Sequence, residues 1–100
     1  MSSIVKRLLD EGAKIQIIDV REPLEYELAN IGAVNIPLHS IQENVDLIER
    51  EIPVIVHCKS GQRSTNAIRQ LQQLHRFTNL LNMKGGLVKW REEVDPSLTL

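Results

Sequence analysis

The chain has 100 residues, of which 42% are hydrophobic and 25% charged, and it carries a formal net charge of −1. This length and composition predict a single globular domain over residues 1–100. The near-neutral charge provides no basic field for nucleic acid, and no apolar run approaches the roughly 20 residues that cross a bilayer. Asp10 and Glu11 stand where a secretory apolar segment would continue, so we expect no signal peptide and a cytoplasmic protein.

The chain begins with a predicted helix and a predicted strand. Residues 3–11 place apolar side chains one helical turn apart; Ser2 or Ser3 can cap this helix and Gly12 can end it. Residues 14–20 are short and rich in β-branched side chains, which is typical of a buried strand.

The next segments predict two short helices around a second strand. Pro23 suits the first position of a helix that runs to Leu28. Residues 33–36 predict a short strand that Pro37 stops. Asn44 can then cap a helix that uses the apolar residues Val45, Leu47 and Ile48.

The second half predicts two strands, each followed by a helix. Residues 53–57 are the most apolar run and indicate a central parallel strand. Residues 78–82 predict a further strand, Gly85-Gly86 a turn, and residues 87–93 a last helix. Between the strands, residues 64–75 predict a helix with one apolar face: Ala67, Ile68, Leu71 and Leu74.

Strands that alternate with helices predict an α/β fold with a parallel sheet. The carboxyl ends of all strands then lie along one edge, where ligands bind in such folds. The segments after Asp19, His57 and Asn82 should therefore gather there. Cys58 directly follows the central strand, so we expect it at this edge and not in the core.

Cys58 is the only cysteine, which rules out an intrachain disulfide. With three scattered histidines it offers no metal-ligand spacing, so we expect neither metal nor cofactor and a reducing compartment. A lone cysteine is either a buried small hydrophobe or a reactive thiol. Its neighbours favour the reactive thiol, because a polar loop joins the strand to a helix: Cys58, Lys59, Ser60, Gly61, Gln62, Arg63 and Ser64.

This segment, residues 58–64, is called the cysteine loop below. A thiol loses its proton more easily near a helix N-terminus or a cation, and Lys59 and Arg63 supply two positive charges. Gly61 permits backbone conformations in which successive N–H groups point inward as an anion-binding ring. Such a ring would hold the terminal sulfur of a persulfide. The alternative is a polar turn with a half-buried cysteine.

Four further residues have structural or functional interpretations. Asp19 either fixes the geometry of the loop edge or accepts backbone N–H bonds in a turn; we favour the turn, with Arg21 paired to a carboxylate such as Glu25. His57 could form a dyad with the cysteine, but consecutive strand residues point to opposite faces. Trp90 is expected to anchor the core.

The cysteine loop resembles the active-site loop of single-domain rhodaneses. Over roughly residues 15–96 the outer motifs are similar too: Asp19-Val20-Arg21-Glu22-Pro23 with Glu25-Tyr26, Gly32-Ala33-Val34-Asn35-Ile36-Pro37-Leu38, and Lys84-Gly85-Gly86 before Trp90. The resemblance implies a rhodanese-like parallel sheet of four to five strands with helices on both faces. A fifth strand requires the extreme N-terminus to pair. At residues 29–33 the chain lacks the His and Pro of many rhodaneses and is one residue shorter, which leaves that turn open.

The most similar subtype is the C-terminal rhodanese domain of E1-like adenylyltransferase/sulfurtransferases. Short matches carry this resemblance: Glu25–Gly32, His57–Gly61 and Val94–Ser97. It implies a ubiquitin-like sulfur carrier protein or a fused E1-like domain as partner.

The resemblance implies a two-step sulfur relay through Cys58. Its thiolate would take sulfur from an anionic donor, thiosulfate or a protein persulfide, and pass it to a thiophilic acceptor. Lys59, Ser60, Gly61, Gln62, Arg63 and Ser64 would bind the donor, with Asp19 and Arg21 in support. Two alternatives stay open. A Cys-based phosphatase or arsenate reductase needs five residues between Cys and Arg, whereas this loop has four. A non-catalytic docking module would not need the cysteine and its cations.

Overall fold

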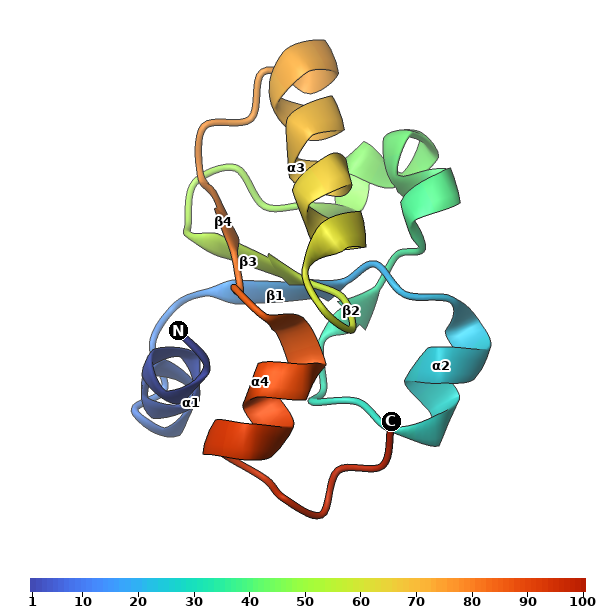
Figure 1. Cartoon of the computed structure of the whole chain (residues 1–100). Helices are drawn as coiled ribbons and strands as arrows, with labels where there is room; N and C mark the ends of the chain where they lie inside the picture. Colours follow the sequence, from blue (N-terminus) through green and yellow to red (C-terminus); the bar gives the residue numbers. More distant parts are fainter.

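The computed structural model describes all residues, 1–100, and builds them around a four-stranded parallel sheet (Figure 1). The strand order is β2-β1-β3-β4. The prediction of an α/β fold with four strands is confirmed, and the chain adds no fifth strand because its N-terminus lies in a helix. The strands are β1 (Gln16–Asp19), β2 (Val34–Asn35), β3 (Val54–His57) and β4 (Leu80–Asn82).

Helices cover both faces of the sheet (Figure 1). Helices α1 (Ser2–Asp10) and α4 (Gly86–Glu93) pack together on one face. The 3₁₀ segment η1 (Leu38–Leu47) and helix α3 (Gln62–His75) pack together on the other. Helix α2 (Pro23–Leu28) lies beside the sheet, and the C-terminus ends near it. None of these helices is both long enough and apolar enough to cross a bilayer.

The alternation of side chains along β1 and β3 divides the core into two clusters. Ile17 and Ile55 point to the cluster that includes α1 and α4, where Trp90 is buried as predicted. Ile18 and Val56, one residue further along each strand, point to the cluster under α3 and η1. Because neighbouring strand residues face opposite sides, both faces of the sheet need apolar side chains, which explains the continuous apolar runs in the sequence.

The predicted cap of the first helix is wrong. Met1 is the N-cap residue, and Ser2 is the first helical residue with a buried hydroxyl that has no partner. Neither serine side chain caps the helix, since the chain enters it one residue earlier than the capping pattern indicates. At the other end Gly12 has a φ of 70°, so it leaves the helix in the left-handed conformation that favours glycine.

The predicted helix after Asn44 is also wrong. The helical segment η1 already begins at Leu38, directly after Pro37, and is a 3₁₀ helix. Asn44 lies inside it with non-helical angles, φ −121° and ψ 25°, and its side-chain amide donates to the Ser40 carbonyl at 2.8 Å. The proline therefore starts a helical turn as well as ending the strand, and the completely buried Ile41 fixes this segment against the core.

Helix α3 begins at Gln62, two residues before the predicted start, and its apolar face ends before Leu74. Ala67 and Leu71 are buried, but Leu74 is 60% exposed. The chain reverses at Arg76, whose φ is 58°, so that Phe77 covers the core at this end. Phe77, which follows the helix, thus fills the place in the core that the apolar pattern assigns to Leu74.

Candidate active site around Cys58

Cys58 directly follows β3 at the carboxyl edge of the sheet, as the sequence predicts, but it is not a surface residue. Only 1% of it is exposed, and it packs with the apolar cluster under α3. The prediction that it lies outside the core is therefore wrong. Only four residues separate the end of β3 from Gln62, where α3 begins, and the thiol is enclosed at this tight turn. Burial disfavours the thiolate, so neighbouring groups must stabilise a negative charge on this sulfur.

Three hydrogen bonds converge on the sulfur of Cys58. The Gly61 N–H donates to Sγ at 3.0 Å, and the Ser64 N–H donates to it at 3.4 Å. The Ser64 hydroxyl lies 3.5 Å from the same sulfur. These donors belong to the N-terminal turn of α3, where backbone N–H groups have no partners within the helix. Two N–H groups therefore point at the Cys58 sulfur itself, whereas the sequence places such a ring around the outer sulfur of a persulfide.

These donors shift the acidity of the thiol. Burial would by itself raise the pKa of Cys58, because it disfavours the charged form. The hydrogen bonds outweigh burial and lower the pKa below its ordinary value. The donors that lower it are, in order of effect, the Ser64 hydroxyl and the backbone N–H groups of Ser64, Gly61 and Ser60. The lowering therefore comes from hydrogen bonds, whereas the sequence assigned it partly to the cations of the loop.

The backbone at Gly61 and the side chain of Asn82 hold this arrangement. Gly61 precedes α3 with a φ of 114°, which a residue with a side chain rarely adopts. The Ser64 hydroxyl donates to Asn82 Oδ1 at the end of β4, at 2.7 Å, and lies 3.0 Å from the Gly61 carbonyl oxygen, so its single proton is shared among these two acceptors and the sulfur. The amide of Asn82 also donates to Thr65 Oγ1 at 3.0 Å. Asn82 thus links the neighbouring strand to the hydroxyl that contacts the sulfur.

Helix α4 holds the cysteine loop from the other side. The Leu87 N–H donates to the Cys58 carbonyl at 3.1 Å, and the Val88 N–H donates to the Lys59 carbonyl at 3.0 Å. Gly86 makes this approach possible, because a Cβ there would lie 2.5 Å from both carbonyl oxygens. Its φ of 56° also favours glycine. Gly86, in the predicted Gly-Gly turn, is therefore needed for α4 to pack against the cysteine loop.

The two cations of the loop have different surroundings. The Nη1 atom of Arg63 lies 2.9 Å and 3.2 Å from the carboxylate oxygens of Glu25 on α2. Lys59 is exposed and forms no ion pair. Glu25 was expected to pair with Arg21; instead it neutralises the arginine of the cysteine loop. Lys59 is then the cation left free beside the thiol.

Asp19 and Arg21 form a buried ion pair behind the loop. Arg21 Nη2 lies 2.7 Å from Asp19 Oδ2, and the Arg21 backbone N–H donates to Oδ1 at 2.9 Å. The turn that the sequence favours at Asp19 is confirmed, but Glu25 is the wrong partner for Arg21, which reaches only the backbone carbonyl of Glu25, at 3.3 Å. Arg21 also donates to the Ala29 carbonyl at 2.7 Å, so the pair ties α2 to β1.

The remaining loop residues lie at the rim, and His57 does not contact the thiol sulfur. Ser60 and Gln62 are exposed. The recorded partners of the His57 ring are the Cys58 carbonyl and Asp19, so the structure contains no Cys–His dyad. The site thus gathers residues that sequence reasoning did not assign to it: Glu25, Asn82, Gly86 and Leu87. Position at a strand end was the only sequence signal for Asn82.

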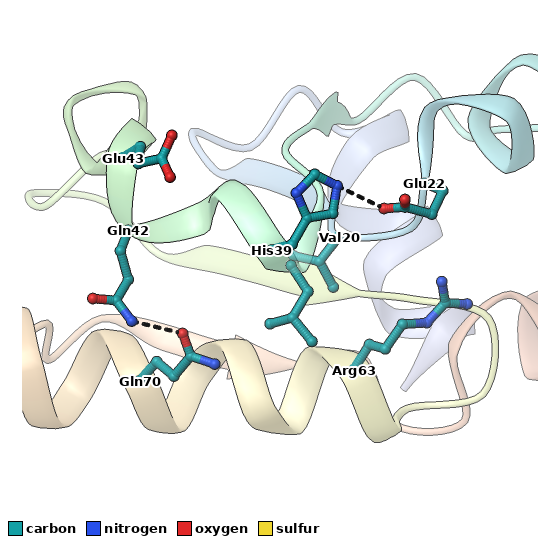
Figure 2. A pocket seen from close by; sticks show the side chains of 8 residues that line it. Val20, Glu22, His39, Gln42, Glu43, Arg63 and Gln70 are labelled. Carbon is teal, nitrogen blue, oxygen red and sulfur yellow. Dashed lines mark hydrogen bonds and ion pairs between the residues drawn. The ribbon is translucent and has the colours of Figure 1, made fainter.

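A broad, open pocket lies beside the cysteine loop (Figure 2), and Cys58 does not line it. It has a volume of about 740 Å³ between η1 and α3, and it touches the loop only through Arg63. Across it the side chains of Gln42 and Gln70 hydrogen-bond at 3.0 Å, and His39 lies 3.2 Å from Glu22. A bound molecule here would neighbour the arginine but would not reach Cys58, so we place the chemistry at the cysteine loop.

Replacing Ser64 should make Cys58 less acidic. Ser64→Ala removes the side-chain hydrogen bond that lowers the thiol pKa most, so the pKa of Cys58 should rise. The measurement is the rate of alkylation by iodoacetamide as a function of pH. Ser3→Ala is the control, because Ser3 is an exposed serine on α1 with no contact to the cysteine loop. Equal midpoints for Ser64→Ala and the unaltered chain would contradict this role.

The chain is similar to proteins of one family over almost its whole length. A family model described as a rhodanese-like domain matches residues 2–93. YqhL of Bacillus subtilis, an uncharacterised protein, is 41% identical over 93 residues, covering 87% of this chain and 73% of YqhL. A sulfurtransferase of Allochromatium vinosum is 32% identical over 89 residues, covering 88% of this chain and 81% of that protein.

Longer relatives and a solved structure agree with these matches. The probable adenylyltransferase/sulfurtransferase MoeZ of Mycobacterium tuberculosis is 30% identical over 95 residues, which cover 92% of this chain. The match spans only about a quarter of MoeZ, 24% of its length. A rhodanese-related protein from Thermoplasma volcanium has a structure with a TM-score of 0.81 and 30% identity, covering 99% of this chain and 94% of that one. The resemblance to E1-like adenylyltransferase/sulfurtransferases, which short motifs indicate, is therefore confirmed as sequence similarity to MoeZ.

Proposed function

The chain belongs to the rhodanese-like domain family, and from this premise we propose that it is a sulfurtransferase that carries sulfur as a persulfide on Cys58. The observation that carries the proposal is the convergence of N–H groups on the Cys58 sulfur, at 3.0 Å from Gly61 and 3.4 Å from Ser64. Relatives named as sulfurtransferases support the same class of reaction. The supporting physical argument is that these donors stabilise negative charge on sulfur.

The reaction has two steps at the sulfur of Cys58. The thiolate attacks the outer sulfur of thiosulfate or of a protein persulfide; a new S–S bond forms, the donor's S–S bond breaks, and sulfite or a thiolate leaves with the electron pair. An acceptor nucleophile then attacks the outer sulfur of Cys58, and the thiolate returns. The N–H donors and the Ser64 hydroxyl stabilise the thiolate at the beginning and end of this cycle.

The physiological donor and acceptor are proposed from the relatives. MoeZ is named as an adenylyltransferase/sulfurtransferase, and YrkF of Bacillus subtilis as a putative sulfur carrier protein. We infer that a ubiquitin-like sulfur carrier or an E1-like domain, fused or separate, receives sulfur from this domain. A thiolate of that partner would attack the outer sulfur of Cys58, so that a persulfide forms on the partner and the Cys58 thiolate leaves. The pairing of Arg63 with Glu25 supports a protein donor over a free dianion, because it leaves Lys59 as the one unpaired cation of the loop.

A Cys-based phosphatase is the rival that the site geometry disfavours. Four residues separate Cys58 from Arg63, and Arg63 is held by Glu25 and not turned to the sulfur. A test of both chemistries uses one preparation of the unaltered chain. We expect thiocyanate from thiosulfate and cyanide and no hydrolysis of p-nitrophenyl phosphate. Phosphate release without thiocyanate formation would overturn the proposal, and the absence of both would favour a docking module.

Lys59→Ala should raise KM for thiosulfate more than it lowers kcat. An exposed charge stabilises the bound anionic donor by up to about 1 kcal/mol. Loss of this attraction should raise KM about two- to fivefold. The effect should fade at high salt, where exposed charges are screened. Lys6→Ala, which removes the same charge on α1, is the control. A lower kcat at unchanged KM and at every salt concentration would show instead that Lys59 acts on the thiol.

A further inference from the structure

The ring of His57 is the one buried titratable group beside the thiol that the proposed reaction does not use. His57 ends β3 and is 0% exposed. Its Nδ1 atom lies 3.2 Å from the carbonyl oxygen of Cys58. Its Nε2 atom has no hydrogen-bond partner and lies 3.8 Å from Asp19 Oδ2. Both ring nitrogens therefore face oxygen atoms that can only accept a hydrogen bond.

These contacts select the tautomer of a neutral ring. A carbonyl oxygen has no proton to give, so the proton must be on Nδ1 to form the bond with Cys58. The doubly protonated ring would also satisfy Asp19, but Arg21 already neutralises that carboxylate at 2.7 Å. Burial, the largest effect, and Arg21 together lower the pKa of His57 by more than Asp19 and the Cys58 carbonyl raise it. The neutral ring with its proton on Nδ1 is the state that fits.

The bond from His57 acts on the peptide that opens the cysteine loop. The Cys58 carbonyl accepts two donors, His57 Nδ1–H and the Leu87 N–H at 3.1 Å. With this carbonyl held, the peptide between Cys58 and Lys59 has a fixed orientation. Two of the three N–H groups that lower the thiol pKa, those of Ser60 and Gly61, belong to the residues that follow this peptide, and the third is that of Ser64.

We propose that His57 is a positioning residue whose Nδ1–H fixes the Cys58 carbonyl, and that this contact keeps the N–H groups of the cysteine loop directed at the sulfur. Asp19 and Arg21 complete the arrangement, because the Asp19 carboxylate, satisfied by Arg21, does not draw the proton to Nε2. The proposal concerns the ionisation of Cys58 and goes beyond the sulfur transfer proposed above. It can be tested without any sulfur donor.

The first test compares two amides that mimic different ring nitrogens. In His57→Asn the side-chain N–H occupies the place of Nδ1, whereas in His57→Gln it occupies the place of Nε2. The readout is the midpoint of the pH–rate profile for alkylation of Cys58 by iodoacetamide in the full chain. We expect His57→Asn to keep the midpoint, and His57→Gln and His57→Leu to raise it by about half to one pH unit, the effect of one lost hydrogen bond.

All three substitutions change a buried position, so each can lower stability whatever the role of His57. Circular dichroism and the thermal unfolding midpoint identify the variants that remain folded. Among folded variants, a midpoint raised equally in Asn and Gln, or raised in none, would overturn the proposal. If the variants shift the alkylation midpoint as expected but the unaltered chain transfers no sulfur, the proposed function fails and the role of His57 stands.

A second test uses the unaltered chain and does not depend on folding of a variant. The ¹⁵N NMR signals of the His57 ring distinguish the Nδ1–H tautomer, the Nε2–H tautomer and the imidazolium. We expect the neutral Nδ1–H form at pH 7. The Nε2–H tautomer there would overturn the proposal, because its Nδ1 has no proton to donate to the Cys58 carbonyl. An imidazolium would keep that bond but overturn the assignment of a neutral ring.

Discussion

Cys58→Ser should abolish sulfur transfer from thiosulfate and leave the fold intact. The serine hydroxyl has far too high a pKa to become a nucleophile in this ring of N–H groups, and it cannot form a persulfide. The fold should survive because the smaller hydroxyl fits the place of the thiol and can accept the same bonds from Gly61 and Ser64. The measurement is thiocyanate formation, with circular dichroism to verify the fold.

Cys58 is buried in the cluster under α3, so its replacement changes the core as well as the reactive group. Burying a hydroxyl costs little only where hydrogen-bond donors are present, and here they are. Residual sulfur transfer by Cys58→Ser would show that another group carries the sulfur. An unfolded variant would show that the thiol has a packing role that the hydroxyl cannot fill.

Gly86→Ala should disrupt the cysteine loop. The new Cβ would lie 2.5 Å from the backbone oxygens of Cys58 and Lys59, which cannot move aside as a flexible side chain can. Helix α4 must then withdraw and lose its bonds to these carbonyls. With the left-handed strain, the expected loss of stability is about 2–5 kcal/mol, and the activity should fall with the order of the loop.

Gly32→Ala is the matched control for Gly86→Ala. Gly32 also has a positive φ, of 82°, but a Cβ there would meet no atom within 4 Å. It should cost only the left-handed strain of about 1–2 kcal/mol and leave the thiol chemistry unchanged. Urea unfolding measures the stability of both variants, and alkylation of Cys58 measures the order of the loop. Equal losses in both variants would contradict the role of the close approach at Gly86.

The sheet could be predicted because its signals are local. Runs of β-branched residues at 14–20 and 53–57 mark strands whose side chains face the core on both sides. The errors arose where local signals compete. Pro37 ends a strand and also starts the 3₁₀ segment, and Leu74 has helical spacing but lies beyond the part of α3 that the core covers. Only the three-dimensional packing decides between such alternatives.

The site could be predicted where one stretch of chain supplies it, and not where distant segments meet. The loop from Cys58 to Ser64 was identified because strand, glycine and helix follow one another. The contacts that adjust it join residues far apart in the chain: Arg63 with Glu25, Ser64 with Asn82, and Leu87 with Cys58. No spacing rule connects these pairs, so sequence alone assigned Arg63 a free charge that Glu25 in fact neutralises.

The most direct test of the account is the intact mass of the unaltered chain after treatment with thiosulfate, measured before and after addition of dithiothreitol. The lowered thiol pKa and the ring of N–H groups predict a gain of one sulfur atom, located on Cys58 by peptide mapping and removed by the reductant. An unchanged mass with both thiosulfate and a low-molecular-weight persulfide as donor would contradict the proposal that Cys58 carries sulfur. So would a gain that the reductant does not remove.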